Sequence, residues 1–96
     1  MSTEPDIRRE ANAEGGRYVL TQNGAEAELT WSVLGPNKIS ADHTGVPDVM
    51  GGTGAGKALV ERLVEDARRD GVTIVSRCSF VSAMARRHPE WSDLFG

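Results

Sequence analysis

The chain has 96 residues, a length typical of a single small domain. Its net charge of -3 argues against a nucleic-acid-binding surface, and 39% apolar with 26% charged residues argues against a disordered chain. No apolar run reaches the length of a membrane span, and a single cysteine cannot form a disulfide within the chain. We therefore expect a cytoplasmic protein with neither a membrane nor a nucleic acid as its partner.

The N-terminal region differs in composition from the rest. It is polar and charged and ends in two glycines, so residues 1–16 are predicted to be a flexible tail and residues 17–96 the folded domain. Three strands are then predicted from alternating apolar side chains. They cover residues 17–22, 25–33 and 38–44, joined by turns at Asn23-Gly24 and at Gly-Pro-Asn 35–37.

A long amphipathic helix is predicted next, from residue 53 or 54 to Asp70. Leu59, Leu63 and Ala67 recur at i, i+4 spacing, and Gly71 is well placed to end the helix.

The remaining elements complete the predicted fold. Residues 72–76 are rich in β-branched side chains and predict a strand, and a second helix is expected from residue 79 or 80 to Arg87. The order βββ-α-β-α predicts an α+β fold. Its small mixed sheet would have one parallel crossover through the long helix.

Four glycines lie within residues 51–56, directly before the long helix, in a segment that we call the glycine loop. The first amides of a helix lack a partner within it, and the helix dipole adds partial positive charge there. Glycine also lets an anion approach the backbone closely. The amides of residues 52–56 are therefore expected to be free to bind phosphate oxygens.

Two interpretations of the glycine loop compete. Residues 51–57 match the P-loop pattern G-x-x-x-x-G-K, but Ala58 stands where a Ser or Thr would bind magnesium. The alternative is the pyrophosphate loop of an acyl-CoA site, with the pattern Arg/Gln-x-x-Gly-x-Gly/Ala. Gly54 and Gly56 occupy its two small positions, and Gly51 replaces the Arg or Gln.

Three separated motifs favour the second interpretation. They are His-Thr-Gly-Val-Pro at 43–47 before the glycine loop, Cys-Ser-Phe-Val at 78–81, and Arg-His-Pro-Glu-Trp at 87–91. With them the chain resembles the GCN-related N-acetyltransferase (GNAT) superfamily over residues 17–95, and more closely its very small YjdJ-type branch. The resemblance implies a reduced acyl-CoA N-acyltransferase core that binds acetyl-CoA and moves the acetyl group to an unidentified amine.

The resemblance also implies the site. The strands at 38–44 and 72–77 would part to admit the pantetheine arm, and backbone amides near 41–44 would bind the thioester oxygen. His43 would be the general base, and Cys78 would accept the acetyl group or form a mixed disulfide with CoA. No metal site is expected. The residues expected to bind acetyl-CoA are Thr44, Val46, Gly51, Gly52, Thr53, Gly54, Ala55, Gly56, Lys57, Cys78 and Phe80.

Other interpretations of the domain and of its candidate residues also stay open. The domain could bind acyl-CoA without turnover, bind a nucleotide in the manner of a P-loop, or be an interaction domain whose glycines only make a turn. His43 could be a strand-end histidine bonded to backbone, and Cys78 a small buried apolar side chain. YjdJ-type chains often carry tyrosines where this chain has Phe80 and Met84. The sequence is compatible with a monomer or with a weak homodimer.

Overall fold

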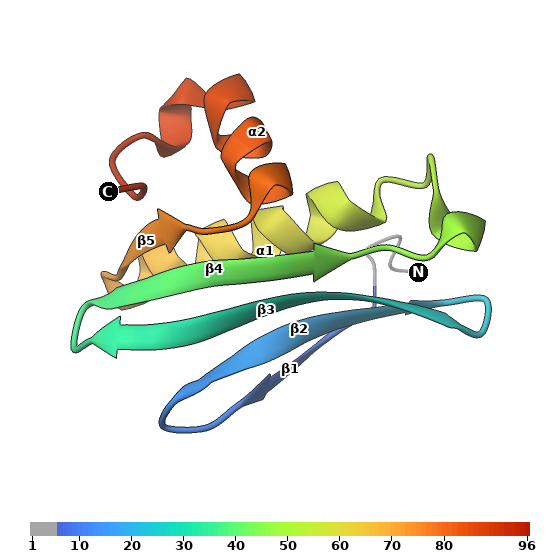
Figure 1. The fold of residues 1–96 in the computed structure, drawn as a ribbon, viewed down its shortest axis with the longest axis horizontal. Helices are drawn as coiled ribbons and strands as arrows, with labels where there is room; N and C mark the ends of the chain where they lie inside the picture. Colours follow the sequence, from blue (N-terminus) through green and yellow to red (C-terminus); the bar gives the residue numbers. More distant parts are fainter. Residues whose placement is uncertain (1–5) are drawn as a thin grey trace.

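The computed structural model describes residues 6–96, which form one five-stranded sheet with helices packed against it (Figure 1). The strands are β1 (Ile7–Ala11), β2 (Gly15–Gln22), β3 (Ala25–Gly35), β4 (Lys38–Gly45) and β5 (Thr73–Ser76). The helices are α1 (Ala55–Asp70) and α2 (Ser79–Arg87), with single 3-10 turns η1 (Asp48–Met50) and η2 (Pro89–Trp91).

The sheet follows chain order, β1-β2-β3-β4-β5. The first four strands are antiparallel, and β5 lies parallel to β4 after the crossover through α1. The predicted α+β fold with a small mixed sheet is thus confirmed, with one additional strand at its start. Within residues 6–96, neither helix is long and apolar enough to cross a membrane.

The prediction of a flexible tail over residues 1–16 is wrong from residue 6 onward, and residues 1–5 lie outside the described part. Strand β1 pairs with β2 from Ile7 opposite Leu20 to Ala11 opposite Gly16. An edge strand needs little apolar surface, because backbone hydrogen bonds on one side can hold it. An edge strand of charged residues lacks the alternating apolar side chains from which strands are predicted.

The other boundaries lie close to the predicted ones. The turn between β2 and β3 has positive φ at both central residues, 51° at Asn23 and 80° at Gly24, as a two-residue hairpin requires. Helix α1 begins at Ala55 and ends at Asp70, where Gly71 adopts the left-handed conformation with φ 69°.

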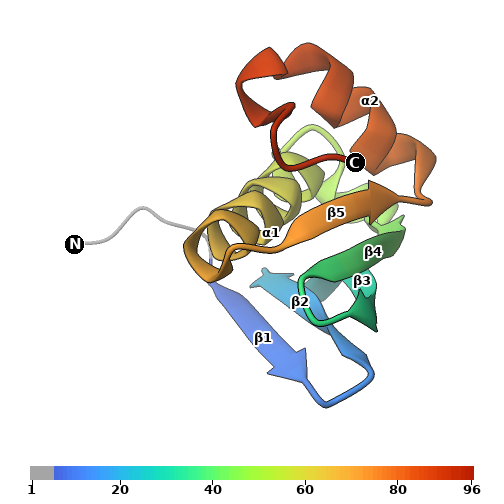
Figure 2. The same cartoon turned by 90° about the vertical axis from the view of Figure 1, so that its left-hand side faces the viewer.

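Helix α1 covers one face of the sheet, and α2 packs beside it next to β5 (Figure 2). The side chains of Tyr18, Leu29, Leu59, Leu63 and Ile74 are at most 1% exposed between the sheet and α1. Burial of such side chains is the main favourable term in folding. The C-terminal part joins the same core through its buried residues Val81, Met84, Trp91 and Leu94.

No helix of residues 6–96 covers the opposite face of the sheet, which we call the open face. Charged side chains lie across β1, β2 and β3 there: Arg17 pairs with Glu10 at 2.7 Å and with Glu28 at 3.3 Å. Val19 lies among these strands and is only 1% exposed. The aliphatic stems of the paired side chains explain how an apolar residue can be buried on this face.

One buried carboxylate ties α1 to the sheet. Asp66 of α1 is 5% exposed and accepts a hydrogen bond of 2.7 Å from the Tyr18 hydroxyl. Arg62 and Arg69, one turn away on the same helix, approach the carboxylate to 3.3 Å and 3.2 Å. Burial and then the bond to this carboxylate raise the Tyr18 pKa, so the phenol stays protonated and donates.

We expect Tyr18→Phe to lower the free energy of unfolding by about 1.5–3 kcal/mol, because a buried carboxylate loses its phenolic donor. The measurement is urea denaturation followed by circular dichroism. Asp70→Asn, which alters only an exposed pair, is the control and should change stability by less than about 0.5 kcal/mol. Equal stability of Tyr18→Phe and the parent would contradict the role given to this hydrogen bond.

Candidate functional site

Strands β4 and β5 part halfway along β4. Their parallel pairing runs from Lys38 opposite Thr73 to Ala41 opposite Ser76, and the Arg77 amide donates a final bond of 2.8 Å to the Ala41 carbonyl. Strand β4 then continues to Gly45, whereas the other chain segment turns away into α2. Residues 42–45 therefore have no strand on that side within the described part, and the expected opening between the strands lies there.

A β-bulge lies at the same place. Trp31 of β3 pairs with Ala41, and Thr30 pairs with His43, so that Asp42 has no partner. Thr30 and its neighbour Trp31 face opposite sides of the sheet, so their partners His43 and Ala41 do as well. In a regular strand, two residues separated by a single residue would face the same side. The bulge thus turns His43 to the open face and leaves Thr44 on the face that carries α1.

Cys78 and Thr44 come together at the opening. The Cys78 sulfur lies 3.5 Å from the Thr44 hydroxyl oxygen, and Cys78 is 8% exposed directly before α2. Burial opposes ionisation of the thiol and is the largest single influence on its pKa. The Thr44 hydroxyl and then the backbone amides of Val81, Phe80 and Thr44 outweigh it, so the pKa of Cys78 lies below its ordinary value.

His43 lies apart from this pair. Its side chain is exposed on the open face, and its Nε2 atom would be 3.4 Å from a Cβ placed on Gly45, its neighbour on that face. The structure therefore does not bring together the two residues predicted to be catalytic. It places His43 and Cys78 on opposite sides of the same opening, which suits separate tasks better than direct contact.

The glycine loop follows η1 at the end of β4 (Figure 1). The prediction that all amides of residues 52–56 are free is wrong for Thr53. The Thr53 amide donates to the Met50 carbonyl at 3.3 Å, and the Thr53 hydroxyl donates to the same oxygen at 2.6 Å. Thr53 therefore closes the loop on itself instead of offering its groups outward. Among residues 6–96, no acceptor is found for the amides of Gly52, Gly54, Ala55, Gly56 and Lys57.

Each of three glycines in the loop has a particular reason to be there. Gly52 and Gly54 have φ of 78° and 80°, the left-handed region that favours glycine, and Gly54 is the N-cap of α1. At Gly56 the reason is space, because a Cβ there would lie 2.7 Å from the ring of Phe80. Phe80 of α2 is thus packed against the first turn of α1, and the structure brings this predicted site residue to the loop.

The remaining predicted residues surround the loop. Lys57, in the first turn of α1, is exposed and forms no ion pair with any residue from 6 to 96. Val46 is 38% exposed just before η1, and Gly51 donates its amide to the Asp48 carbonyl at 2.9 Å. The loop therefore offers free amides and a free cation with apolar side chains at its border, a combination that suits an anion attached to an organic group.

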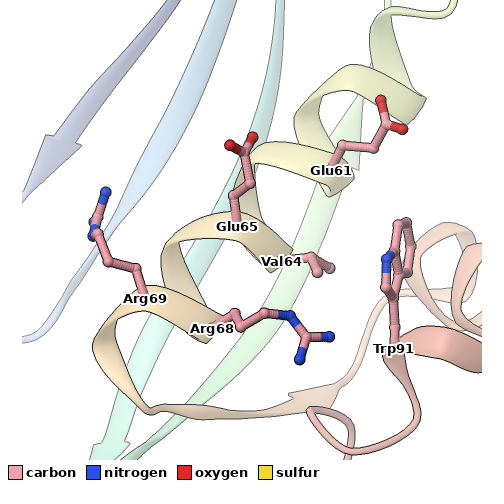
Figure 3. A pocket seen from close by; sticks show the side chains of 6 residues that line it. All are labelled: Glu61, Val64, Glu65, Arg68, Arg69 and Trp91. Carbon is pink, nitrogen blue, oxygen red and sulfur yellow. The ribbon is translucent and has the colours of Figure 1, made fainter.

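A hollow lies between α1 and η2 (Figure 3). Both of its arginines have partners: Arg68 reaches Asp93 at 3.0 Å, and Arg69 reaches Asp66 at 3.2 Å. Paired guanidinium groups beside two glutamates give no advantage to a phosphate, so the glycine loop is the better anion site. The hollow, of about 690 Å³, is lined by Glu61, Val64, Glu65, Arg68, Arg69 and Trp91.

Sequence reasoning did not identify Asp42 as a residue of this site. Its carboxylate accepts hydrogen bonds from the hydroxyls of Ser32 and Ser40, the latter at 2.6 Å. Ser40 lies two residues before Asp42 on the same strand and therefore on the same face, whereas Ser32 lies ten residues away in the sequence and is brought close by the pairing of β3 with β4. No local pattern in the sequence shows which residue of β3 faces Asp42.

A parallel strand pair that parts beside a helix with free N-terminal amides defines an acyl-CoA N-acyltransferase type of fold, here in reduced form. A family model described as GCN5-related N-acetyl-transferase matches residues 17–94, and the chain belongs to this family. The resemblance to the GNAT superfamily inferred from the sequence motifs is confirmed.

A solved structure supports the same assignment. The NMR structure of a GCN5-like protein from Staphylococcus aureus is 32% identical to this chain and covers 99% of it, the match spanning 91% of that protein, with a TM-score of 0.75. The search of curated proteins gave no match. The additional strand β1 is included in the structural match, whereas the family model begins within β2.

The contact between Thr44 and Cys78 can be tested directly. Thr44→Val removes a hydroxyl that stabilises the thiolate, so the pKa of Cys78 should rise and less thiolate should be present at neutral pH. The measurement is the pH dependence of Cys78 alkylation by iodoacetamide, whose midpoint should move to higher pH. Thr30→Val, on the open face, is the matched control and should leave the midpoint in place. An unchanged midpoint in Thr44→Val would refute the role given to Thr44.

Proposed function

We propose that this domain binds acetyl-CoA and transfers its acetyl group to an amine. The observation that carries the proposal is the juxtaposition of the glycine loop, with its free amides, and the opening between β4 and β5 where Cys78 meets Thr44. The family generally uses acetyl-CoA. The Staphylococcus aureus relative has been provisionally assigned as an N-acetyltransferase.

The loop matches the charged end of acetyl-CoA. A pyrophosphate needs several donors and positive potential, and the amides of residues 54–57 together with the dipole of the 16-residue helix α1 supply both. Lys57 adds an unpaired cation in the first turn of α1, and Phe80 borders the loop with an apolar ring. From the loop, the pantetheine arm would follow the free edge of β4 at residues 42–45 toward Cys78.

The proposed transfer uses both sides of the opening. An ammonium acceptor first loses one proton to His43, because an imidazole nitrogen can accept it as a general base. The free nitrogen attacks the thioester carbon; the carbon–nitrogen bond forms and the carbon–sulfur bond breaks, and sulfur keeps the electron pair. The second proton of the nitrogen then goes to the departing CoA thiolate, which leaves an amide and CoA. In the covalent alternative, Cys78 carries the acetyl group between the two partners.

A second candidate is an acyl-CoA-binding module without turnover. It is favoured by two residues of α2, because the side chains of Phe80 and Met84 cannot donate a proton to a leaving thiolate, as a tyrosine could. Met84 is also only 6% exposed and belongs to the core. Binding of acetyl-CoA without acetyl transfer to any amine would select this candidate.

Binding is tested by an amide-resolved NMR titration with acetyl-CoA. We expect shifts concentrated at residues 41–60 and 76–84, because these segments form the loop and the opening. CoA and magnesium-ATP serve as comparison ligands. A response to magnesium-ATP alone would favour the P-loop interpretation, and the absence of any response to acetyl-CoA would overturn the proposed function.

The contribution of the glycine loop is tested with Gly54→Ala. We expect a loss of about tenfold in acetyl-CoA affinity by calorimetry, because the substitution disturbs the N-cap that presents the free amides. Gly24→Ala is a matched control: it has the same φ of 80° and the same open surroundings, but lies in the distant β2–β3 hairpin. Equal affinities of the two variants would show that the loop does not hold the ligand.

A further inference from the structure

Asp42 holds a fixed negative charge at the opening between β4 and β5. Its half-buried carboxylate is oriented by two hydroxyl donors, Ser32 on β3 and Ser40 on β4. Ser40 is itself 0% exposed, so its side chain has little freedom to turn away. A carboxylate bonded by one hydroxyl at each oxygen keeps its direction and still has lone pairs free for another donor.

Most carboxylates near Asp42 pair with a cation, and within residues 6–96 Asp42 does not. On the same face, Glu10 and Glu28 each pair with an arginine, and Glu26 also lies near one. Asp42 has no Lys, Arg or His nitrogen within 4.0 Å among residues 6–96. A cationic ligand would supply the partner that the Asp42 carboxylate lacks among these residues.

The position of Asp42 relates it to His43. The pairing of Thr30 with His43 and of Ser32 with Ser40 places these four residues on the open face, and the bonds to both serines bring the Asp42 carboxylate to that face as well. Thr44 and Cys78 lie on the other side of β4. An acceptor that approached from the open face would meet Asp42 and His43 before it reached the thioester.

We propose that Asp42 is the recognition group for the acceptor and that it selects a primary ammonium, such as an alkylammonium or a lysine side chain. This inference rests on the proposed function, since it assigns the second substrate of the same site. Attraction to a carboxylate favours the charged form of an amine, so Asp42 contributes to recruitment, and deprotonation falls to His43. Asp42 is therefore a specificity residue, and binding is the property to measure.

The simpler role for Asp42 is to stabilise the bulge through its two serines. Asp42→Asn separates the two roles, because asparagine keeps the size of the side chain and an oxygen that accepts one serine bond, but removes the charge. Glu28→Gln is the matched control. It removes the same charge from the same face, at the position opposite Gly45, from a carboxylate that already has Arg17 as its partner.

The test is an NMR titration in the presence of saturating CoA, with n-butylamine as the cationic probe and n-butanol as its neutral counterpart. We expect wild-type protein to respond to butylamine at residues 30–32 and 40–43 and to respond far less to butanol. Asp42→Asn should weaken butylamine binding by about tenfold, whereas Glu28→Gln should bind it as the wild type does.

The outcomes separate this inference from the proposed function. If acetyl-CoA binds at the glycine loop but wild-type protein does not distinguish butylamine from butanol at these residues, the ammonium site is wrong and the proposed function stands. Equal butylamine binding by Asp42→Asn and wild type also overturns it. Should Asp42→Asn fail to fold, the comparison of the two probes on the wild type still decides. Absence of acetyl-CoA binding, seen separately, refutes the proposed function.

Discussion

The early end of β5 is the constraint on which the rest of this structure depends. Its pairing with β4 stops at Ala41 and Ser76, because the chain must turn there to begin α2 at Ser79. A parallel partner that ends early leaves the second half of β4 with an unpaired edge, which a sheet normally covers or blocks. Here that edge lies between a thiol on one side and a carboxylate and an imidazole on the other, and in the proposed function this unpaired backbone is where the thioester would bind.

Close packing behind the site allows a domain of this size to tolerate such an opening. Helix α1 is fixed to the sheet by the side chains of Leu59 and Leu63 and by the bond between Tyr18 and Asp66, all of which lie beyond its first turn. The N-terminal amides of α1 can then stay free without loss of the helix, since its position is determined elsewhere along its length. The contact of Phe80 with Gly56 extends this fixed arrangement to α2.

Much of this could be predicted from the sequence, and the failures have physical reasons. Alternation in β2 to β4, the Asn23-Gly24 turn and the i, i+4 row of α1 are local signals, and they gave the elements and the α+β class. Strand β1 was missed because its residues are mostly charged and its stability comes from pairing with β2. The separation of His43 from Cys78 follows from the bulge, and the bond between Ser32 and Asp42 follows from the pairing of β3 with β4; both are properties of two strands in register and not of either one alone.

The bulge also has a consequence for how this strand can change by insertion or deletion. In a regular strand, one residue more or less reverses the sides of every residue beyond it. At Asp42 the additional residue is absorbed, because the pairs Trp31–Ala41 and Thr30–His43 stay in place on either side of it. A chain of this fold could lose that residue and keep the core pairing around it intact, so the length of β4 is adjustable by one residue at the position of Asp42.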